Sequence, residues 1–235
     1  FTGRIAPRDD RNSLFPLMKR AGYRVGVISG QPESFGNIAG VTGMKANADV
    51  FIDAHVLEDE RAGAFTAESS LFVDESRLIK AFDAHFGKAA DWTEPVFLYI
   101  NFQTPHFPYW HAGIKNRIEF DPLRRDEIVP ESRDRLMRTY MNAVAWSDHH
   151  VGELLARLRR LGVLDNTLIL VTGDHGESLF DNGFLGHGHN ISPAQNETTL
   201  VFNRPIAIEA SAIGLSDYSR ILAAAVAGER RVRLG

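Results

Sequence analysis

The chain has 235 residues, of which 44% are hydrophobic and 24% are charged, as in an average globular domain. Its formal net charge of -4 excludes the basic face that binds a phosphate backbone, so we expect no nucleic-acid partner. The absence of cysteine excludes disulfides and thiolate metal sites.

The sequence contains no apolar run of about 18 residues or more, and its first residues, FTGRIAPRDD, do not form a signal peptide. We therefore expect no membrane segment in this chain. Phe1 does not look like a natural start, because there is no initial Met, and any anchor or export signal would have to lie upstream.

Strand-like apolar runs alternate with amphipathic helix-like runs along the chain. The pattern predicts, in order, a helix at 12–21 that ends before Gly22, strands at 23–29 and 49–54, a helix at 74–86, a strand at 95–102, a helix from about 131 to 161, and strands at 167–172 and 204–209. This alternation indicates βαβ units. The predicted fold is α/β, a three-layer α/β/α sandwich with a mostly parallel sheet, and residues 1–235 are expected to form one domain.

Two predicted strands end in loops that carry histidine. The strand PVFLYINF runs into QTPHFPYWH with His106, and the strand TLILVT runs into GDHGE with Asp174 and His175. Ligands of open α/β sheets bind at the carboxyl ends of the strands. If these two strands are parallel and adjacent, the three side chains emerge at the same edge of the sheet.

Asp174 and His175 are candidate metal ligands. The flanking Gly173 and Gly176 give the backbone freedom for both side chains to converge on one ion. A carboxylate beside an imidazole suits Zn, Mn or, with more oxygen ligands, Ca. Further ligands would have to come from elsewhere in the fold, and a simple turn followed by a capped helix start is the alternative.

Three further histidines are candidates for direct chemistry. His187 and His189 flank Gly188 and could share a face, where they could hydrogen-bond to an anion or protonate a leaving group, although a solvated loop is the alternative. His106 lies in a loop stiffened by Pro105 and Pro108, a good mount for a catalytic side chain. The remaining histidines are weaker candidates: His111 is a poorer one, His149 and His150 form the polar side of a packed helix, and His55 and His85 lie at the surface.

Together these segments resemble the sulfatase branch of the alkaline phosphatase superfamily, in order and over most of the chain. FLYINFQTPHFPY is similar to the family's strand and Pro-His-x-Pro-Tyr loop, and LILVTGDHGE is similar to its metal-binding strand and turn. GFLGHGHN resembles the loop that follows, and the weaker FTGR element resembles the segment after the family's nucleophile.

The resemblance implies a role for each candidate residue. Asp174 and His175 would be ligands of a divalent metal ion, with Glu177 orienting His175 from outside the ligand shell. His106 would contact the anionic group of the substrate, and His187 or His189 would hold an oxyanion or leaving-group oxygen. The implied reaction is attack on sulfur or phosphorus by a metal-activated side chain, which gives a covalent enzyme ester.

The nucleophile of this family precedes the TGR element, and this chain begins at that element. No residue of 1–235 is nominated in its place, because the hydroxyls of Thr2 and Ser29 do not match. A sheet without its first strand would lack a central member and leave backbone groups unpaired. We therefore expect the natural protein to extend beyond Phe1 by several tens of residues that carry the nucleophile.

A second departure lies at ISGQPESFGN, residues 28–37. Many sulfatases have a lysine and a histidine here that bind sulfate, whereas this chain has Gln31 and Glu33. The segment resembles more closely the Pro-Ser-Phe-x-Asn stretch of lipoteichoic-acid-synthase-like phosphotransferases, without their aromatic and arginine. Sulfate and phosphate esters of small molecules, glycans or lipids thus both stay open as substrates.

Three functions are compatible with these residues. The first is a metal-dependent hydrolase of sulfate or phosphate esters. The second is a membrane-tethered phosphoglycerol or phosphoethanolamine transferase of the same fold, and the third is a catalytically degenerate member that binds anions. The resemblance favours a periplasmic or secreted location.

Overall fold

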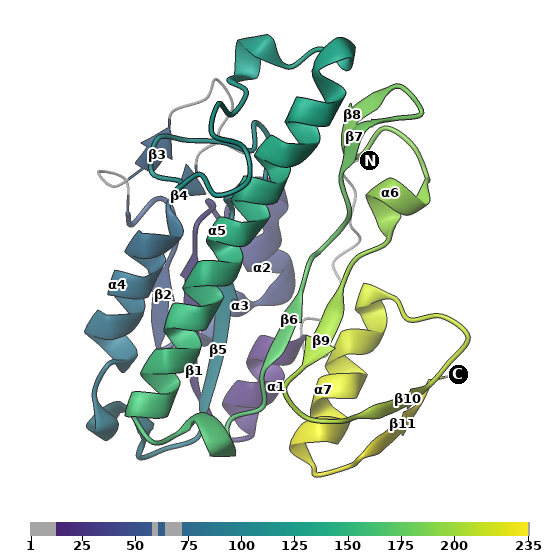
Figure 1. Ribbon diagram of the computed structural model, residues 1–235. Helices are drawn as coiled ribbons and strands as arrows, with labels where there is room; N and C mark the ends of the chain where they lie inside the picture. Colours follow the sequence, from purple (N-terminus) through teal and green to yellow (C-terminus); the bar gives the residue numbers. More distant parts are fainter. Residues whose placement is uncertain (1–12, 58–60, 64–71, 235) are drawn as a thin grey trace. The chain divides into compact units, whose positions relative to one another are not determined.

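The structure is a computed structural model that describes residues 13–57, 61–63 and 72–234 (Figure 1). The FTGR element and Asn12, the first residue of the predicted N-terminal helix, lie outside the described residues. The chain divides into two compact units, residues 1–165 and 166–235, and each is described by itself. The single domain expected over 1–235 stays a prediction.

The first unit is built on a parallel sheet of three strands. β1 (Arg24–Ser29) lies between β2 (Val50–Ile52) and β5 (Val96–Asn101), and both neighbours run parallel to it. β1 is buried over most of its length, whereas β5 is half-buried throughout. β5 was expected to be covered on both sides; within the described sheet it is an edge strand with one neighbour, which accounts for its exposure.

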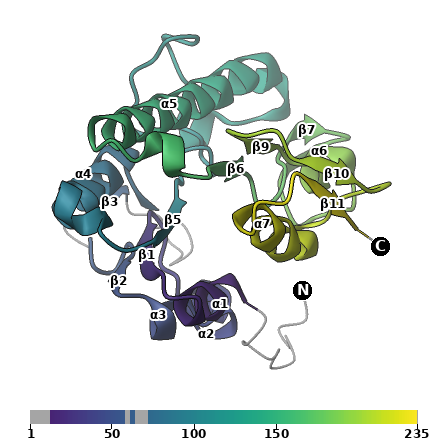
Figure 2. The same ribbon diagram turned by 90° about the horizontal axis from the view of Figure 1, so that it is seen from below.

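Helices cover both faces of this sheet (Figure 2). The helices on one face are α1 (Leu14–Arg20), α2 (Ile38–Thr42) and α3 (Met44–Asn47), and those on the other are α4 (Glu75–Phe86) and α5 (Arg133–Arg160). The predicted α/β sandwich with a parallel sheet is confirmed. Both long helices begin and end within two residues of their predicted limits.

Side-chain size explains the contact of the helices with the sheet. On the first face, Phe15 and Met18 of α1 pack on Val25 and Val27 of β1. On the second face, a Cβ at Gly26 would lie 2.5 Å from the ring of Phe86, so glycine lets α4 approach the central strand closely.

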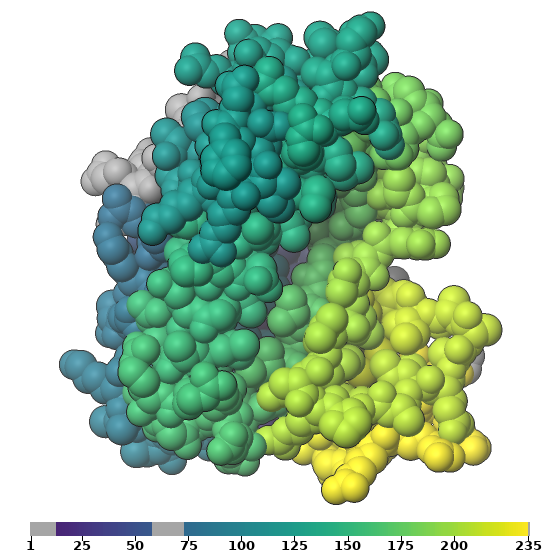
Figure 3. Space-filling model, viewed as in Figure 1, coloured from purple at the N-terminus to yellow at the C-terminus, as the bar shows by residue number. Residues whose placement is uncertain are grey.

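The carboxyl end of the sheet is followed by long irregular segments. Residues 102–132, between β5 and α5, form a continuous layer of side chains, teal at the top of Figure 3. A short antiparallel pair, β3 (Arg61–Gly63) and β4 (Phe72–Val73), also belongs to this unit. Among the described residues, 3₁₀ turns are found at Phe35–Asn37, Ala89–Trp92, Arg125–Glu127, Pro130–Ser132, Leu164–Asn166 and Leu215–Asp217.

Over residues 166–234, the second unit contains three strand pairs and two helices. β6 (Leu170–Thr172) pairs antiparallel with β9 (Leu200–Phe202), β7 (Ser178–Asp181) pairs antiparallel with β8 (Phe184–Gly186), and β10 (Ala207–Glu209) pairs parallel with β11 (Arg231–Arg233). The helices are α6 (Pro193–Asn196) and α7 (Tyr218–Val226).

Two predicted strands of this unit are shorter than expected. β6 was expected to be buried over 167–172, but it has three residues and Val171 is 41% exposed, since its described pairing is with β9 alone. β10 starts at Ala207, after Pro205, which has no N–H to donate. In the described part of the chain, we find no helix that combines the length and the apolar character of a membrane span.

Candidate active site

A two-residue hairpin turn brings two motifs together: the Asp-His motif, Asp174 and His175, and the second histidine motif, His187 to His189. Asn182 and Gly183 join β7 to β8 with φ values of 52° and 81°, the left-handed backbone that Asn-Gly adopts in tight hairpins. Ser178 is paired with Gly186 at the open end of the hairpin. The next residues on each side, Glu177 and His187, therefore become neighbours.

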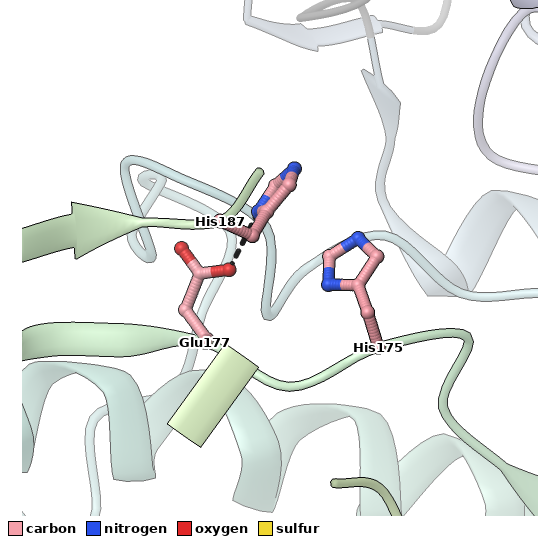
Figure 4. Close-up of side chains that lie close together, drawn as sticks. All are labelled: His175, Glu177 and His187. Atoms are coloured by element: carbon pink, nitrogen blue, oxygen red, sulfur yellow. Dashed lines mark hydrogen bonds and ion pairs between the residues drawn. The ribbon is translucent and has the colours of Figure 1, made fainter. Parts of the chain in front are cut away.

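Glu177 and His187 form an ion pair in the structure (Figure 4). The Nδ1 atom of His187 lies 2.7 Å from a carboxylate oxygen of Glu177, whose side chain is 9% exposed. The hydrogen bond to Glu177 raises the pKa of His187, against the opposing effect of burial. A protonated His187 also carries an N–H on Nε2.

Asp174 and His175 lie at the end of β6, and both are exposed. Nδ1 of His175 is 2.8 Å from the carbonyl oxygen of Gly176. Because a carbonyl oxygen only accepts, Nδ1 carries the proton of the neutral ring and Nε2 keeps its lone pair. That Nε2 atom lies 3.7 Å from Oδ2 of Asp174.

These atoms fit a divalent cation. Two donors bound about 2.1 Å from one ion lie roughly 3 to 4 Å apart, and the separation of Nε2 of His175 from Oδ2 of Asp174 is 3.7 Å. The ligand atoms of His175, Glu177 and His187 also lie within 4.8 Å of one another, with the two rings 4.0 Å apart. The donors are oxygen and imidazole nitrogen, the set that Zn and Mn accept.

Two glycines let the following segment pack against this turn. A Cβ at Gly176 would lie 2.7 Å from the carbonyl oxygen of Glu197 and would also clash with that of Ala194. A Cβ at Gly173 would clash with the hydroxyl of Thr198. The motif thus needs glycine because residues 194–198 press on its backbone.

Gln195, which contacts the segments of both motifs, was not predicted from the sequence. Its side chain is 2% exposed and contacts the backbone of His189 and Asn190 and the hydroxyl of Ser178. Ser192 and Pro193 are a usual start for a helix and would have predicted α6. No local pattern marks Gln195 as buried.

His106 lies in the first unit, in the loop after β5. Its Nδ1 atom is 2.9 Å from the carbonyl oxygen of Phe107. The loop is anchored two residues earlier, where Thr104 donates its N–H, at 2.8 Å, and its hydroxyl to Glu75, the first residue of α4. Ser147 of α5 donates to the same carboxylate at 3.1 Å.

Asp74, Glu75 and His111 lie close together at this anchor, with Glu75 and His111 buried and Asp74 half-buried. Burial raises the pKa of Glu75 and lowers the pKa of His111. The ligand atoms already accept from protein donors, with Trp146 donating to Asp74 at 3.0 Å and the N–H of Gly113 to His111 at 3.1 Å. N–H groups that point at these ligand atoms would repel a cation. The cluster therefore supports the loop through hydrogen bonds.

The segment with Gln31 and Glu33 is also at the carboxyl end of the sheet. Glu33 is fully buried, and its Oε1 atom accepts from the hydroxyl of Ser29 at 2.5 Å. Burial raises the pKa of Glu33. The hydroxyl of Ser29 thus donates to Glu33.

The structure brings four predicted site residues together in the second unit: Asp174, His175, Glu177 and His187. His189 lies in the same loop. Glu177 is bonded to His187, and its expected role in orienting His175 stays a prediction. His106 belongs to the first unit, and the predicted adjacency of β5 and β6 also stays a prediction.

Comparison with known proteins gives the family. Residues 2–202 match the family model described as Sulfatase. The ulvan-active sulfatase of Formosa agariphila is 28% identical over 112 residues, which are 45% of this chain and 22% of that protein. The low-salt glycan biosynthesis sulfotransferase Agl7 of Haloferax volcanii is 32% identical over 120 residues, 49% of this chain and 28% of that protein.

A solved structure supports the fold. The crystal structure of an alkaline phosphatase superfamily protein from Vibrio parahaemolyticus superimposes with a TM-score of 0.55 at 18% identity, over 85% of this chain and 44% of that one. The chain thus spans about a quarter of the length of the two curated relatives and less than half of this structure. Because the family model covers most of its residues, the chain belongs to the sulfatase family.

Proposed function

We propose that the protein hydrolyses sulfate or phosphate esters with the help of a divalent cation, through a covalent enzyme ester. The observation that carries this proposal is the juxtaposition of Asp174 and His175, 3.7 Å apart, with the His187–Glu177 pair in a sulfatase-family chain. A sulfatase that acts on ulvan is among the relatives, which supports a glycan ester as one substrate class.

Asp174 and His175 would hold the cation through Oδ2 and Nε2. When bound, a divalent cation supplies Lewis-acid stabilisation of the negative charge on the ester and its nucleophile. The proton on Nδ1 of His175 is fixed by the carbonyl oxygen of Gly176, which keeps Nε2 directed outward as a lone-pair donor. Zn, Mn and Ca are all admitted by this donor set.

His187 supplies positive charge and a proton beside that position. Glu177 accepts the Nδ1–H of His187, and this hydrogen bond raises the pKa of His187. Its Nε2–H can donate to an anionic ester oxygen or protonate the leaving group, and His189 is the alternative donor. His106 would contact the anionic group.

The proposed reaction has two steps, formation and hydrolysis of the enzyme ester. A side-chain nucleophile, to which we assign no residue of this chain, forms a bond to sulfur or phosphorus while the ester bond to the leaving alcohol breaks. A histidine donates a proton to the alcohol, and the proton lost by the nucleophile replaces it. Hydrolysis of the enzyme ester then releases sulfate or phosphate and restores the nucleophile.

Replacement of Asp174 tests the cation site. Asp174→Ala in the full protein is expected to abolish Mn²⁺ binding and turnover of aryl sulfates and phosphates while leaving the fold intact, because one of two assigned ligands is removed. Mn²⁺ titration, steady-state kinetics and circular dichroism measure the three quantities. Glu229→Ala, an exposed acid of the same unit, is the matched control. Undiminished turnover of Asp174→Ala would refute the ligand role.

Transfer to an acceptor other than water is the second candidate. Gln31 and the buried Glu33 lie in the segment where many sulfatases have a lysine and a histidine that bind sulfate. A glycan-biosynthesis sulfotransferase is among the relatives. A product assay with an added alcohol separates the two: hydrolysis gives only free sulfate or phosphate, whereas transfer gives a new ester. Cation binding without any turnover would favour an anion-binding member that has lost its activity.

A further inference from the structure

Gln195 contacts three separate segments of the second unit. Its Oε1 atom accepts the N–H groups of His189 at 3.2 Å and Asn190 at 3.3 Å. Its Nε2 atom donates to the hydroxyl of Ser178 at 3.1 Å, and its backbone carbonyl accepts the N–H of Gly176 at 2.9 Å. One residue therefore touches the Asp-His motif, the start of β7 and the loop of His187 and His189.

The histidine loop (residues 187–190) lies beyond the ladder of β7 and β8. The ladder between β7 and β8 ends at Gly186, and both Gly186 and Gly188 have positive φ values, 85° and 78°. The N–H groups of the loop thus leave the strand pairing and need an acceptor in the protein or in water. Oε1 of Gln195 is that acceptor for two consecutive amides, from a side chain with 2% exposure.

The same side-chain amide also contacts β7, the strand that directly follows Glu177. Ser178 is 1% exposed and directly follows Glu177, which in turn is 2.7 Å from His187. The amide of Gln195 and the Glu177–His187 bond are therefore two connections between the same pair of segments. The connection through Gln195 is neutral and buried, and it does not depend on the charge of His187.

We propose that Gln195 is a positioning residue that fixes the histidine loop against β7 and so aims His187 and His189 at the reacting group. This inference rests on the proposed function. A side chain with 2% exposure does not touch substrate, and its amide neither titrates nor carries charge, so its effect passes through the loop. Its side chain bonds to the loop and to Ser178, so cation binding is expected to survive its replacement.

Three variants of the full protein test the proposal. Gln195→Met keeps the approximate volume and removes every hydrogen bond of the side chain. Gln195→Glu keeps an oxygen for the two loop amides, and the hydroxyl of Ser178 can turn to donate to the carboxylate. Asn196→Ala is the matched control, an exposed neighbour on the same short helix.

Amide exchange gives a readout that does not require activity. In Gln195→Met, the amides of His189 and Asn190 are expected to exchange faster, because they lose their acceptor. The amide of Gly176 serves as an internal standard, since it donates to the backbone of residue 195, which every variant retains. Gln195→Glu is expected to restore the protection of the loop, and Asn196→Ala to leave all three amides unchanged.

Kinetics and metal affinity complete the test. Gln195→Met is expected to lower kcat about tenfold or more, with KM and the Kd for Mn²⁺ little changed, whereas Gln195→Glu recovers most of kcat. Exchange at His189 and Asn190 that does not respond to Gln195→Met overturns the proposal. Faster exchange with an unchanged kcat also overturns it, because the hydrogen bonds of Gln195 would then be structural only. A loss of Mn²⁺ affinity as large as the loss of kcat overturns it as well.

The failure of the proposed function would look different. If the wild-type protein turns over neither sulfate nor phosphate esters, the assigned activity is wrong. The exchange pattern and the Mn²⁺ affinity still decide whether Gln195 fixes the loop without supporting the cation ligands.

Discussion

At the scale of the residue, backbone carbonyls decide which ring nitrogen of two candidate histidines carries the proton of the neutral ring. His175 and His106 each place Nδ1 within 2.9 Å of the carbonyl oxygen of the residue that follows, 2.8 Å for His175 and 2.9 Å for His106. In both neutral rings the proton is therefore on Nδ1, and Nε2 carries the lone pair. His187 differs because its Nδ1 faces a carboxylate, which favours the protonated ring.

Replacement of His106 tests its assignment to the anionic group. His106→Ala is expected to lower kcat/KM for aryl sulfates or phosphates about 100-fold, because a hydrogen bond to developing charge is lost. The loop itself should persist, since Thr104 stays bonded to Glu75. Steady-state kinetics measure the effect, and His85→Ala, an exposed histidine of the same unit, is the control. An unchanged rate would reduce His106 to a loop residue.

Sequence reasoning identified residues whose chemistry is visible in a short motif. Asp174, His175 and His187 stand in glycine-rich segments after a strand, and the structure places them together. Gln195 could not be found in this way, because its importance comes from burial and from partners six and seventeen residues away. Glu75 and His111 were missed or ranked low for the same reason.

At the scale of the element, long patterns predicted well and short ones did not. α4 was expected at 74–86 and spans Glu75–Phe86, with Asp74 capping the N–H of Ser76. The hairpin of β7 and β8 was not predicted, although Asn182 and Gly183 are a strong hairpin signal. Phe180, at φ 65°, interrupts the strand pattern beside a register shift, which hides the alternation.

The hairpin turn gives a test at this scale. Gly183→Ala is expected to destabilise the fold by about 1–2 kcal/mol, because φ at Gly183 is 81°. It should also lower kcat, since the hairpin brings Glu177 to His187. Chemical denaturation and kinetics measure both. Gly214→Ala is the matched control, with φ -109° and no atom closer than 3.6 Å to the added Cβ. Equal effects of the two substitutions would contradict the role of the turn.

At the scale of the whole molecule, the chain separates two kinds of structure. Residues 1–165 contain the parallel sheet and its helix layers, and residues 166–235 contain the assigned cation ligands. Composition and strand-helix alternation were sufficient to predict the α/β architecture. They could not predict the division at Asp165, because no linker-like composition marks it.

This division predicts which residues respond to removal of the cation. Chelation with EDTA is expected to increase amide exchange mainly at residues 173–190, and much less in β1 and β5. A cation at 100 times its Kd stabilises the folded state by about 2.7 kcal/mol. Exchange mass spectrometry of the full protein with and without Mn²⁺ measures the effect. Asp174→Ala should show no response to EDTA, and a response equal to that of the wild type would place the cation elsewhere.

The Asn182–Gly183 turn also has a consequence for how the site forms during folding. Glu177 and His187 are ten positions apart, so the loop that must close to pair them is short and its entropic cost is small. Hairpins of this kind form in about 1–10 μs, whereas parallel pairing of β1 with β5 joins positions about seventy residues apart. Low contact order favours early formation. The histidine-carboxylate pair can therefore be in place before the sheet is complete.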